Sequence, residues 1–149
     1  MEIKNKVTET FDEIFLKLNQ RKLHENQNFK VNAKFSNEFS TLFDSVEKEN
    51  RINISFWIGK NNSVEFYIDR TNELPTFSEK MIESNPSEFY NFIFDLFSSK
   101  LLVQYRGNKT IIHFLNIHGD KFRKLTFQDH IKNVAEKVEE NLYDCFFHF

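Results

Sequence analysis

The clearest structural signal in this sequence is LLVQYRGNKTIIHFLNI, residues 101–117. Two runs rich in β-branched, aliphatic and aromatic residues flank the dipeptide Gly107-Asn108. Both residues of that dipeptide tolerate a positive φ angle, which a two-residue hairpin turn requires. We therefore predict a tight antiparallel hairpin with strands at 101–106 and 109–117. The predicted register pairs Leu101 with Phe114, Val103 with Ile112, Tyr105 with Thr110, Leu102 with His113, and Gln104 with Ile111.

A second hairpin is predicted upstream, where apolar and polar residues alternate on both sides of the turn-forming segment 59–63. Pairing Ile58 with Val64 or Phe66 keeps the apolar residues of both strands on one face, so the loop has three or five residues. The apolar residues concerned are Ile52, Ile54, Phe56, Ile58, Val64, Phe66 and Ile68. The same register sends Trp57, Glu65, Tyr67 and Asp69 to the opposite face.

The remaining segments alternate between strand and helix patterns. Alternation over 29–35 predicts one further strand. Apolar residues at helical spacing predict helices over about 9–22, 37–49 and 127–145, and over 86–98, where they cover nearly the whole circumference. The helix at 86–98 is therefore expected to be buried at the centre of the molecule. Residues 122–127 fit neither pattern clearly.

Three segments resemble helix starts. Thr10 and Thr76 are each followed three residues later by a glutamate, which is the pattern of a capping box. Asn85 precedes Pro86 and Glu88, which places a cap, a first-turn proline and an acidic third position in order. We expect helices to begin at all three.

Composition supports one folded α+β domain over residues 1–149. Phe, Ile, Leu and Val together occupy 49 of the 149 positions, which is enough to form a core. Tight hairpins require antiparallel neighbours, so we predict an antiparallel sheet of about five strands, built from two hairpins and one strand. The buried central helix and the N- and C-terminal helices would pack against it.

Several enzyme classes are excluded by what the chain lacks. Three glycines leave almost no possibility of a glycine-rich phosphate loop, and none of them lies within two residues of a serine, as a hydrolase nucleophile elbow requires. Glu65 and Asp69 on one strand would lie about 13 Å apart, farther than the roughly 5–9.5 Å that separates glycosidase carboxylates. We expect no catalytic residues.

Metal and cofactor binding are not expected either. His113 and His118 would point to opposite faces of one strand, and a turn containing His118 and Asp120 is commoner than a metal site. Cys145 and His148 are close in sequence, but no second cysteine–histidine pair completes a tetrahedron. We interpret Cys145 as a half-buried structural thiol.

The charge balance, the single cysteine and the lack of a visible targeting segment favour a cytoplasmic protein. The formal net charge is −2, which argues against nucleic acid as a partner. Counting the charged residues gives +2 for 1–35, −6 for 36–99 and +2 for 100–149. We see no export signal and no apolar run of the roughly 18 residues that span a membrane, and a single cysteine fits a reducing compartment.

Trp57, Glu65, Tyr67 and Asp69 are the candidate partner-binding residues. Trp and Tyr are enriched where proteins bind each other, and neighbouring carboxylates would select a basic partner. The alternative is that a helix covers this face and both rings belong to the core. The aromatic C-terminus, with Phe146 and Phe147, would either dock under the sheet or form a dimer, so the sequence leaves monomer and homodimer open.

These features favour a non-enzymatic protein-binding module, of the immunity or antitoxin kind, that masks the active site of a basic toxin domain. A first alternative follows from element order: helix, strand, hairpin, helix, hairpin, helix resembles the type III secretion chaperones, apart from the added segment 37–49. That resemblance implies an acidic dimer holding an exported protein. A second alternative, a small enzyme, would require convergence of residues such as Glu65, His113, His118 and Asp120.

Overall fold

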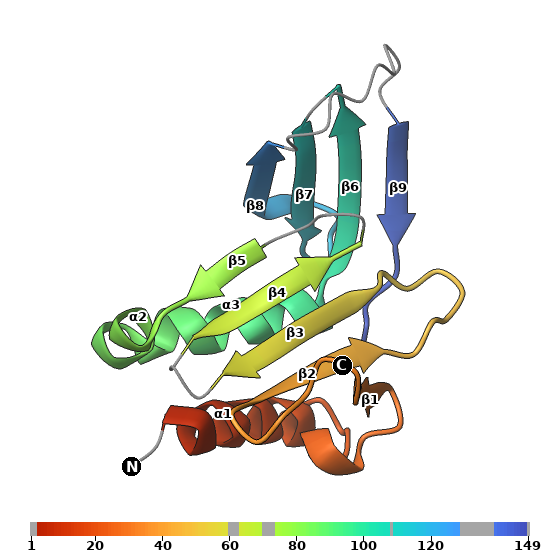
Figure 1. Ribbon diagram of the computed structural model, residues 1–149. Coiled ribbons are helices and arrows are strands. Elements are labelled where there is room, and N and C mark those ends of the chain that lie inside the picture. Colours follow the sequence, from red (N-terminus) through yellow and green to blue (C-terminus); the bar gives the residue numbers. More distant parts are fainter. Residues whose placement is uncertain (1–2, 60–62, 70–73, 108, 129–138, 149) are drawn as a thin grey trace.

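The computed structural model describes residues 3–59, 63–69, 74–107, 109–128 and 139–148 (Figure 1). The helices are α1 (Ile3–Lys17), a short 3-10 helix η1 (Leu23–Glu25), α2 (Glu79–Ser84) and α3 (Pro86–Ser98). The strands are β1 (Phe29–Val31), β2 (Ser40–Ser45), β3 (Ile54–Gly59), β4 (Val64–Ile68), β5 (Leu74–Phe77), β6 (Lys100–Arg106), β7 (Lys109–Leu115), β8 (Lys121–Gln128) and β9 (Glu139–Tyr143).

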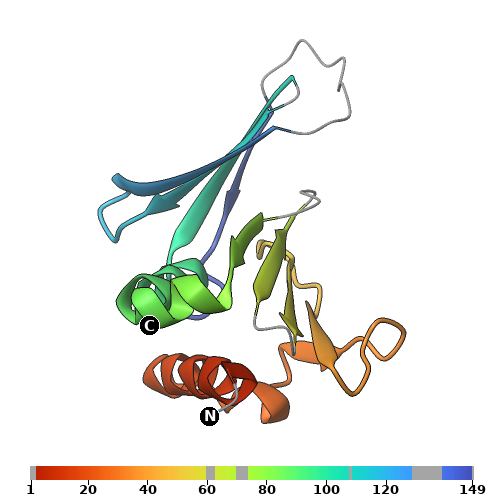
Figure 2. The ribbon, with the colours of Figure 1, turned by 60° about the vertical axis from the view of Figure 1, so that its left-hand side comes forward.

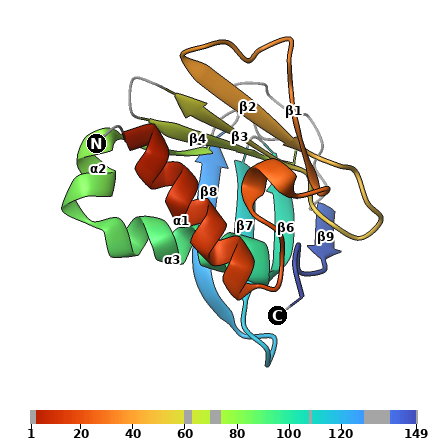
Figure 3. The ribbon, with the colours of Figure 1, turned by 90° about the horizontal axis from the view of Figure 1, so that it is seen from below.

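These strands form two antiparallel sheets. Sheet A has five strands in the order β1-β2-β3-β4-β5, and sheet B has four in the order β8-β7-β6-β9. Helices α1 and α3 lie on one face of sheet A, as the view from below shows (Figure 3). Sheet B stands at an angle to sheet A instead of stacking flat on it (Figures 1 and 2). The α+β class with antiparallel pairing is therefore confirmed, but the single sheet that we expected is two sheets.

Phenylalanine rings fill the space between the helices and sheet A. Phe11 of α1 stacks on Phe56 of β3 with ring centroids 4.5 Å apart, and Phe43 of β2 stacks on the same ring at 5.2 Å. Such ring pairs add to the hydrophobic gain from burial. The face of sheet A that carries Phe56 is therefore the inner face, and the opposite face, which carries Trp57, is the outer face.

Helix α3 connects the two sheets, as expected for a buried central helix. Its residue Phe92 contacts Phe66 of sheet A at 5.4 Å and Phe114 of sheet B at 6.1 Å between ring centroids. Its buried side chains are Phe89, Phe92, Ile93, Leu96 and Phe97. The predicted cap is also present, since the Asn85 side chain accepts a hydrogen bond from the Glu88 backbone N–H at 3.3 Å.

Both predicted hairpins have the expected registers. Ile58 pairs with Val64, which leaves residues 59–63 between the paired positions. Arg106 pairs with Lys109 across the predicted two-residue turn, where Gly107 has a φ angle of 57°. The five predicted pairs between 101–105 and 110–114 are all present. Period-two alternation and turn chemistry were sufficient here because they act over a few neighbouring residues.

The helix predicted over 37–49 is wrong, because Ser40–Ser45 is strand β2. Residues such as Ser40 and Thr41 are weak helix formers, and β2 gains backbone hydrogen bonds from both neighbours in sheet A. Of the apolar residues at helical spacing, Phe43 is buried, whereas Phe39 and Val46 are exposed. Backbone hydrogen bonding of β2 to its two neighbouring strands therefore outweighed the helical spacing of the few apolar residues in 37–49. Of the predicted strand 29–35, only Phe29–Val31 is β1.

Three other helix predictions need correction. Helix α1 begins at Ile3 and ends at Lys17, so Thr10 lies inside it and its hydroxyl donates to the Lys6 carbonyl instead of capping a helix start. Thr76 belongs to β5, and the cap of α2 is Ser78, whose side chain accepts from the Met81 N–H.

The predicted C-terminal helix over 127–145 is also wrong where it can be compared. Residues 139–143 form β9, an edge strand of sheet B that pairs with β6, and residue 127 belongs to β8. The middle of that prediction, 129–138, lies outside the described residues. Among the described helices, none is long and apolar enough to cross a membrane.

Candidate functional site

The outer face of sheet A brings together most of the predicted partner-binding residues. Strand alternation turns Trp57 outward between the buried residues Phe56 and Ile58, and it turns Glu65 and Tyr67 outward in the same way. All three outward side chains are half-buried, whereas the inner-face residues between them are buried. The structure therefore does not place the Trp57 and Tyr67 rings in the core.

Trp57 lies near the centre of a row of side chains that crosses four strands. It is registered opposite Leu42 of β2 on one side and opposite Glu65 of β4 on the other, and Glu65 is in turn opposite Thr76 of β5. Directly opposed antiparallel residues have Cβ atoms about 4.5–5.5 Å apart, so these side chains are immediate neighbours. The row combines two apolar groups with one carboxylate.

A second row lies beside the first. Tyr67 is opposite Ser55, and Ser55 is opposite Asp44 of β2. The Asp44 carboxylate accepts a hydrogen bond of 2.8 Å from the Asn32 side-chain amide. Sequence reasoning missed Leu42 and Asp44 because it assigned both to a helix. Thr41 and Phe43, which are residue types enriched in strands, were the local signals that favoured a strand.

Asp69 has a different setting from the other three predicted residues. It follows the end of β4 with a φ angle of 58°, in the left-handed region, which Asp and Asn adopt more readily than most residues. Its Oδ1 accepts a hydrogen bond of 3.4 Å from the Tyr143 hydroxyl of β9. Asp69 therefore contacts sheet B at one end of the outer face, and its carboxylate is engaged within the molecule.

An apolar cavity of about 530 Å³ lies away from the outer face, beside the C-terminal half of α3. Its apolar lining residues include Phe94, Leu115, Ile117 and Phe122, and Cys145 also lines it. Its size falls in the range of small-molecule sites. None of the residues proposed for an enzyme, Glu65, His113, His118 and Asp120, is among its described lining residues.

The carboxylate of Asp95 lies at the edge of this cavity and pairs with Arg123 of β8. Burial raises the pKa of Asp95, and the Arg123 guanidinium, 3.1 Å away, opposes that rise. Arg123 also bonds Glu88 at 3.0 Å. These ion pairs connect α3 to sheet B, and we therefore interpret Arg123, Asp95 and Glu88 as residues that stabilise the fold.

Sheet B carries a polar row on the face that is turned away from α3. The Gln104 side-chain amide donates to Glu140 at 2.6 Å, and its carbonyl lies 3.0 Å from Nε2 of His113. Burial lowers the pKa of His113, as do the charges of Lys121, Lys124 and Arg106, while Glu140 opposes them. The hydrogen bond between Gln104 of β6 and His113 of β7 connects the two strands on this face.

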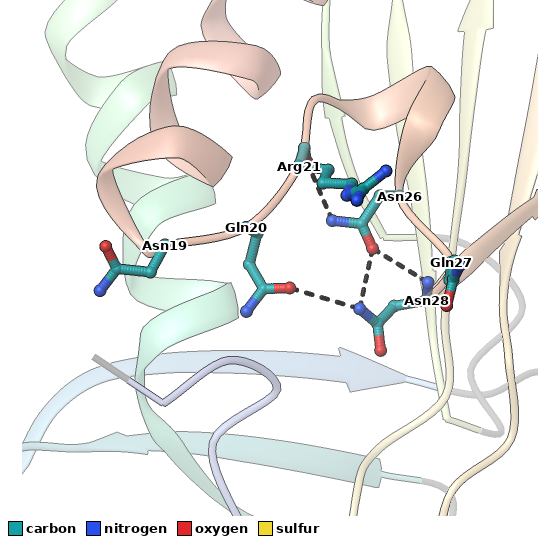
Figure 4. Close-up of a pocket in the computed structure, with 6 residues that line it drawn as sticks. All are labelled: Asn19, Gln20, Arg21, Asn26, Gln27 and Asn28. Atoms are coloured by element: carbon teal, nitrogen blue, oxygen red, sulfur yellow. Dashed lines mark hydrogen bonds between the residues drawn. The ribbon is translucent and has the colours of Figure 1, made fainter.

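Amide side chains line a smaller hollow of about 260 Å³ at the connection between α1 and β1 (Figure 4). The Asn26 amide donates to the Arg21 carbonyl, and the Asn28 amide donates to Gln20 and Asn26. Because these groups satisfy one another, they close the loop around η1. The hollow is therefore a structural feature of that loop.

Three side chains that commonly bind metals meet just after β9. Donor atoms of Asp144, Cys145 and His148 lie within 4.8 Å of one another, and Nε2 of His148 is 3.2 Å from Oδ2 of Asp144. Burial and the neighbouring Asp144 carboxylate raise the pKa of the Cys145 thiol. In the sequence, Cys145 and His148 stand out as a pair, and Asp144, four residues before His148, was not considered with them.

Comparisons of the chain with protein-family models, with curated proteins and with solved structures found no match. Function is therefore inferred from the geometry of these surfaces.

Proposed function

We propose that this protein is a non-enzymatic, cytoplasmic protein-binding module of the immunity or antitoxin kind, which masks the active site of a basic toxin domain. The observation that carries the proposal is the Leu42–Trp57–Glu65 row on the outer face of sheet A. A half-buried tryptophan directly beside a carboxylate supplies a large apolar contact area and a charge that attracts a cationic partner.

The position of the row on a sheet supports this proposal. Three neighbouring strands hold the backbone of Leu42, Trp57 and Glu65, so little conformational entropy is lost in that backbone when a partner binds. Tyr67 in the adjacent row adds a second amphipathic ring. The acidic balance of residues 36–99, −6 by counting charges, has the sign that a basic partner requires.

The element order gives the chaperone alternative less support. That resemblance requires a final helix, whereas the described residues 139–143 form strand β9. Segment 37–49, where the structure has strand β2, was already outside the resemblance.

The first experiment tests binding to the proteins encoded by the neighbouring genes. Each is produced and purified, and its association with this chain and the loss of its own activity are measured together. We expect one of them to be a basic toxin that is inhibited stoichiometrically, with binding that weakens as salt rises. If no neighbouring product binds, or if one binds and keeps full activity, the proposed function is wrong.

Variants of the outer face then locate the contact. Trp57→Ala should weaken binding by about 30-fold or more, the loss that corresponds to roughly 2 kcal/mol at a hot-spot residue. Glu65→Gln should slow association and reduce the salt dependence. Phe35→Ala is the matched control, because Phe35 is an aromatic residue with 53% exposure in the loop between β1 and β2. Equal affinities for Trp57→Ala and Phe35→Ala would show that the partner binds elsewhere.

A further inference from the structure

The segment from Asp144 to His148 is held in place at both ends. The Asp144 backbone N–H donates to the Asn50 carbonyl at 2.8 Å, and the Phe147 N–H donates to the Phe97 carbonyl at 2.8 Å. Phe146 and Phe147 are both buried. The backbone that carries the three donor side chains is therefore fixed by the core.

Aromatic packing strengthens this anchoring. Phe146 stacks on Phe29 at 5.2 Å, and Phe147 packs edge-on against Phe15 at 5.1 Å. The Arg51 guanidinium lies 5.7 Å from the centre of the Phe146 ring. A metal site gains affinity when its ligands need little reordering, so a backbone fixed in this way favours binding.

We propose that Asp144, Cys145 and His148 form a binding site for a single divalent ion of the zinc class. A tetrahedral Zn²⁺ site with sulfur, nitrogen and oxygen ligands has its donor atoms about 3.3–3.6 Å apart, given the usual bond lengths. The three donors here already lie within 4.8 Å of one another, so rotation of the side chains closes the remaining distance.

The chemistry of the donors selects the metal. A thiolate and an imidazole are ligands that Zn²⁺ prefers, whereas Mg²⁺ and Ca²⁺ require oxygen ligands. Asp144 can bind through Oδ2, because its Oδ1 accepts a hydrogen bond from the Cys145 N–H at 2.8 Å, which orients the carboxylate. Three protein ligands leave one position for water. Cys145 lines the 530 Å³ cavity, and the His148 side chain is 67% exposed, so an ion can reach the site.

Co²⁺ added to the 149-residue chain is the first probe. A cobalt–thiolate bond gives a near-ultraviolet charge-transfer band, and Cys145 is the only cysteine in the sequence. We expect this band to reach its maximum at one Co²⁺ per chain, and Zn²⁺ to abolish it by displacement. If the folded protein shows no such band, or if its intensity continues to rise beyond one equivalent, the proposal is wrong.

Substitutions assign the ligands, with the affinity for Zn²⁺ measured by competition with a chromogenic chelator. Loss of a partner outside the first coordination sphere costs about 10–100-fold in metal affinity, so His148→Ala and Asp144→Asn should each cost at least that much. Cys145→Ser should lose the charge-transfer band as well. His118→Ala is the control, because His118 is exposed and lies outside the cluster. Wild-type affinity in His148→Ala or in Cys145→Ser would overturn the proposed ligand set.

Thermal unfolding gives a readout that does not depend on the optical probe. Because a metal that binds only the folded state stabilises it, Zn²⁺ should raise the Tm of the wild type and of His118→Ala. It should leave the Tm of Cys145→Ser unchanged. An equal rise in Cys145→Ser would mean that the ion acts at another place.

Discussion

Phe97 lies at a centre of the aromatic packing in the core and is fully buried. The rings of Phe11, Phe15, Phe29, Phe146 and Phe147 surround it, with centroids 5.3–6.3 Å from its own. These neighbours come from α1, from β1 and from the C-terminal segment, so one side chain of α3 joins parts of the chain that are far apart in sequence.

Truncation of this ring should therefore be costly. Phe97→Ala is expected to lower the free energy of unfolding by about 3–5 kcal/mol, because it removes a fully buried ring and leaves a cavity. Urea unfolding followed by circular dichroism measures the change. Phe35→Ala, at an exposed aromatic position, should change the free energy by less than about 0.5 kcal/mol. Comparable losses in both variants would contradict this packing.

His113 gives the folded state a dependence on pH. Its pKa is lowered in the fold by burial and by Lys121, Lys124 and Arg106, so the unfolded chain binds a proton more readily than the folded chain. Stability is therefore fully present above the unfolded pKa of about 6.5 and falls as the pH drops below that value toward the folded pKa.

The measurement compares the free energy of unfolding at several pH values between 5 and 8 in wild type and in His113→Gln. The glutamine variant should show a smaller loss of stability below about pH 6.5, since it has no imidazole to protonate. A wild-type slope in His113→Gln would show that other groups cause the acid sensitivity.

At the scale of elements, Arg123 is the main polar link between β8 and α3. It pairs with Asp95 at 3.1 Å and with Glu88 at 3.0 Å, and its guanidinium lies 5.8 Å from the centre of the Phe92 ring. Both partners are on the helix, while the next residue of the strand, Lys124, points to the other face of sheet B. Arg123 and Lys124 are therefore neighbouring basic residues of which only Arg123 bonds to α3, so comparing their alanine variants tests the contribution of these ion pairs.

Arg123→Ala should destabilise the protein by about 1–3 kcal/mol, because it leaves the half-buried Asp95 carboxylate without its cation. Lys124→Ala should cost less than about 0.5 kcal/mol, as expected for an exposed charge. Chemical denaturation of both variants at neutral pH measures the difference. If the two values agree within error, the ion pairs of Arg123 contribute no net stability.

At the scale of the whole molecule, α3 makes the two sheets interdependent. Phe92 touches both sheets, and the Tyr143–Asp69 hydrogen bond connects them again at the end of β4. The buried hydrophobic residues of both sheets form one continuous core. If either sheet loses its packing on α3, apolar surface of that sheet and of the helix is exposed to water, and the helix on which the other sheet packs loses support.

We therefore expect one cooperative unfolding transition. Trp57, the only tryptophan in the sequence, reports on sheet A by fluorescence, and the His113 imidazole reports on sheet B by nuclear magnetic resonance. The two probes should give the same urea midpoint. Two separate midpoints would show that the sheets are independent folding units.

The sequence by itself determined the two hairpins, their registers and the buried character of α3. Each depends on residues close together in the chain: a two-residue turn, period-two alternation, or a cap followed by a continuous apolar surface. The same local reasoning placed Trp57, Glu65 and Tyr67 on one face. The contribution of that face to partner binding remains a prediction.

Only the tertiary structure decided what the ambiguous segments became. Residues 40–45 and 139–143 became strands because neighbouring strands offered them backbone hydrogen bonds, which a periodicity within the segment does not record. The same long-range pairing divided the strands into two sheets and brought Tyr143 to Asp69. It also fixed the segment that holds Asp144, Cys145 and His148 together, since that segment is anchored by contacts with Asn50 and Phe97, which are distant in sequence.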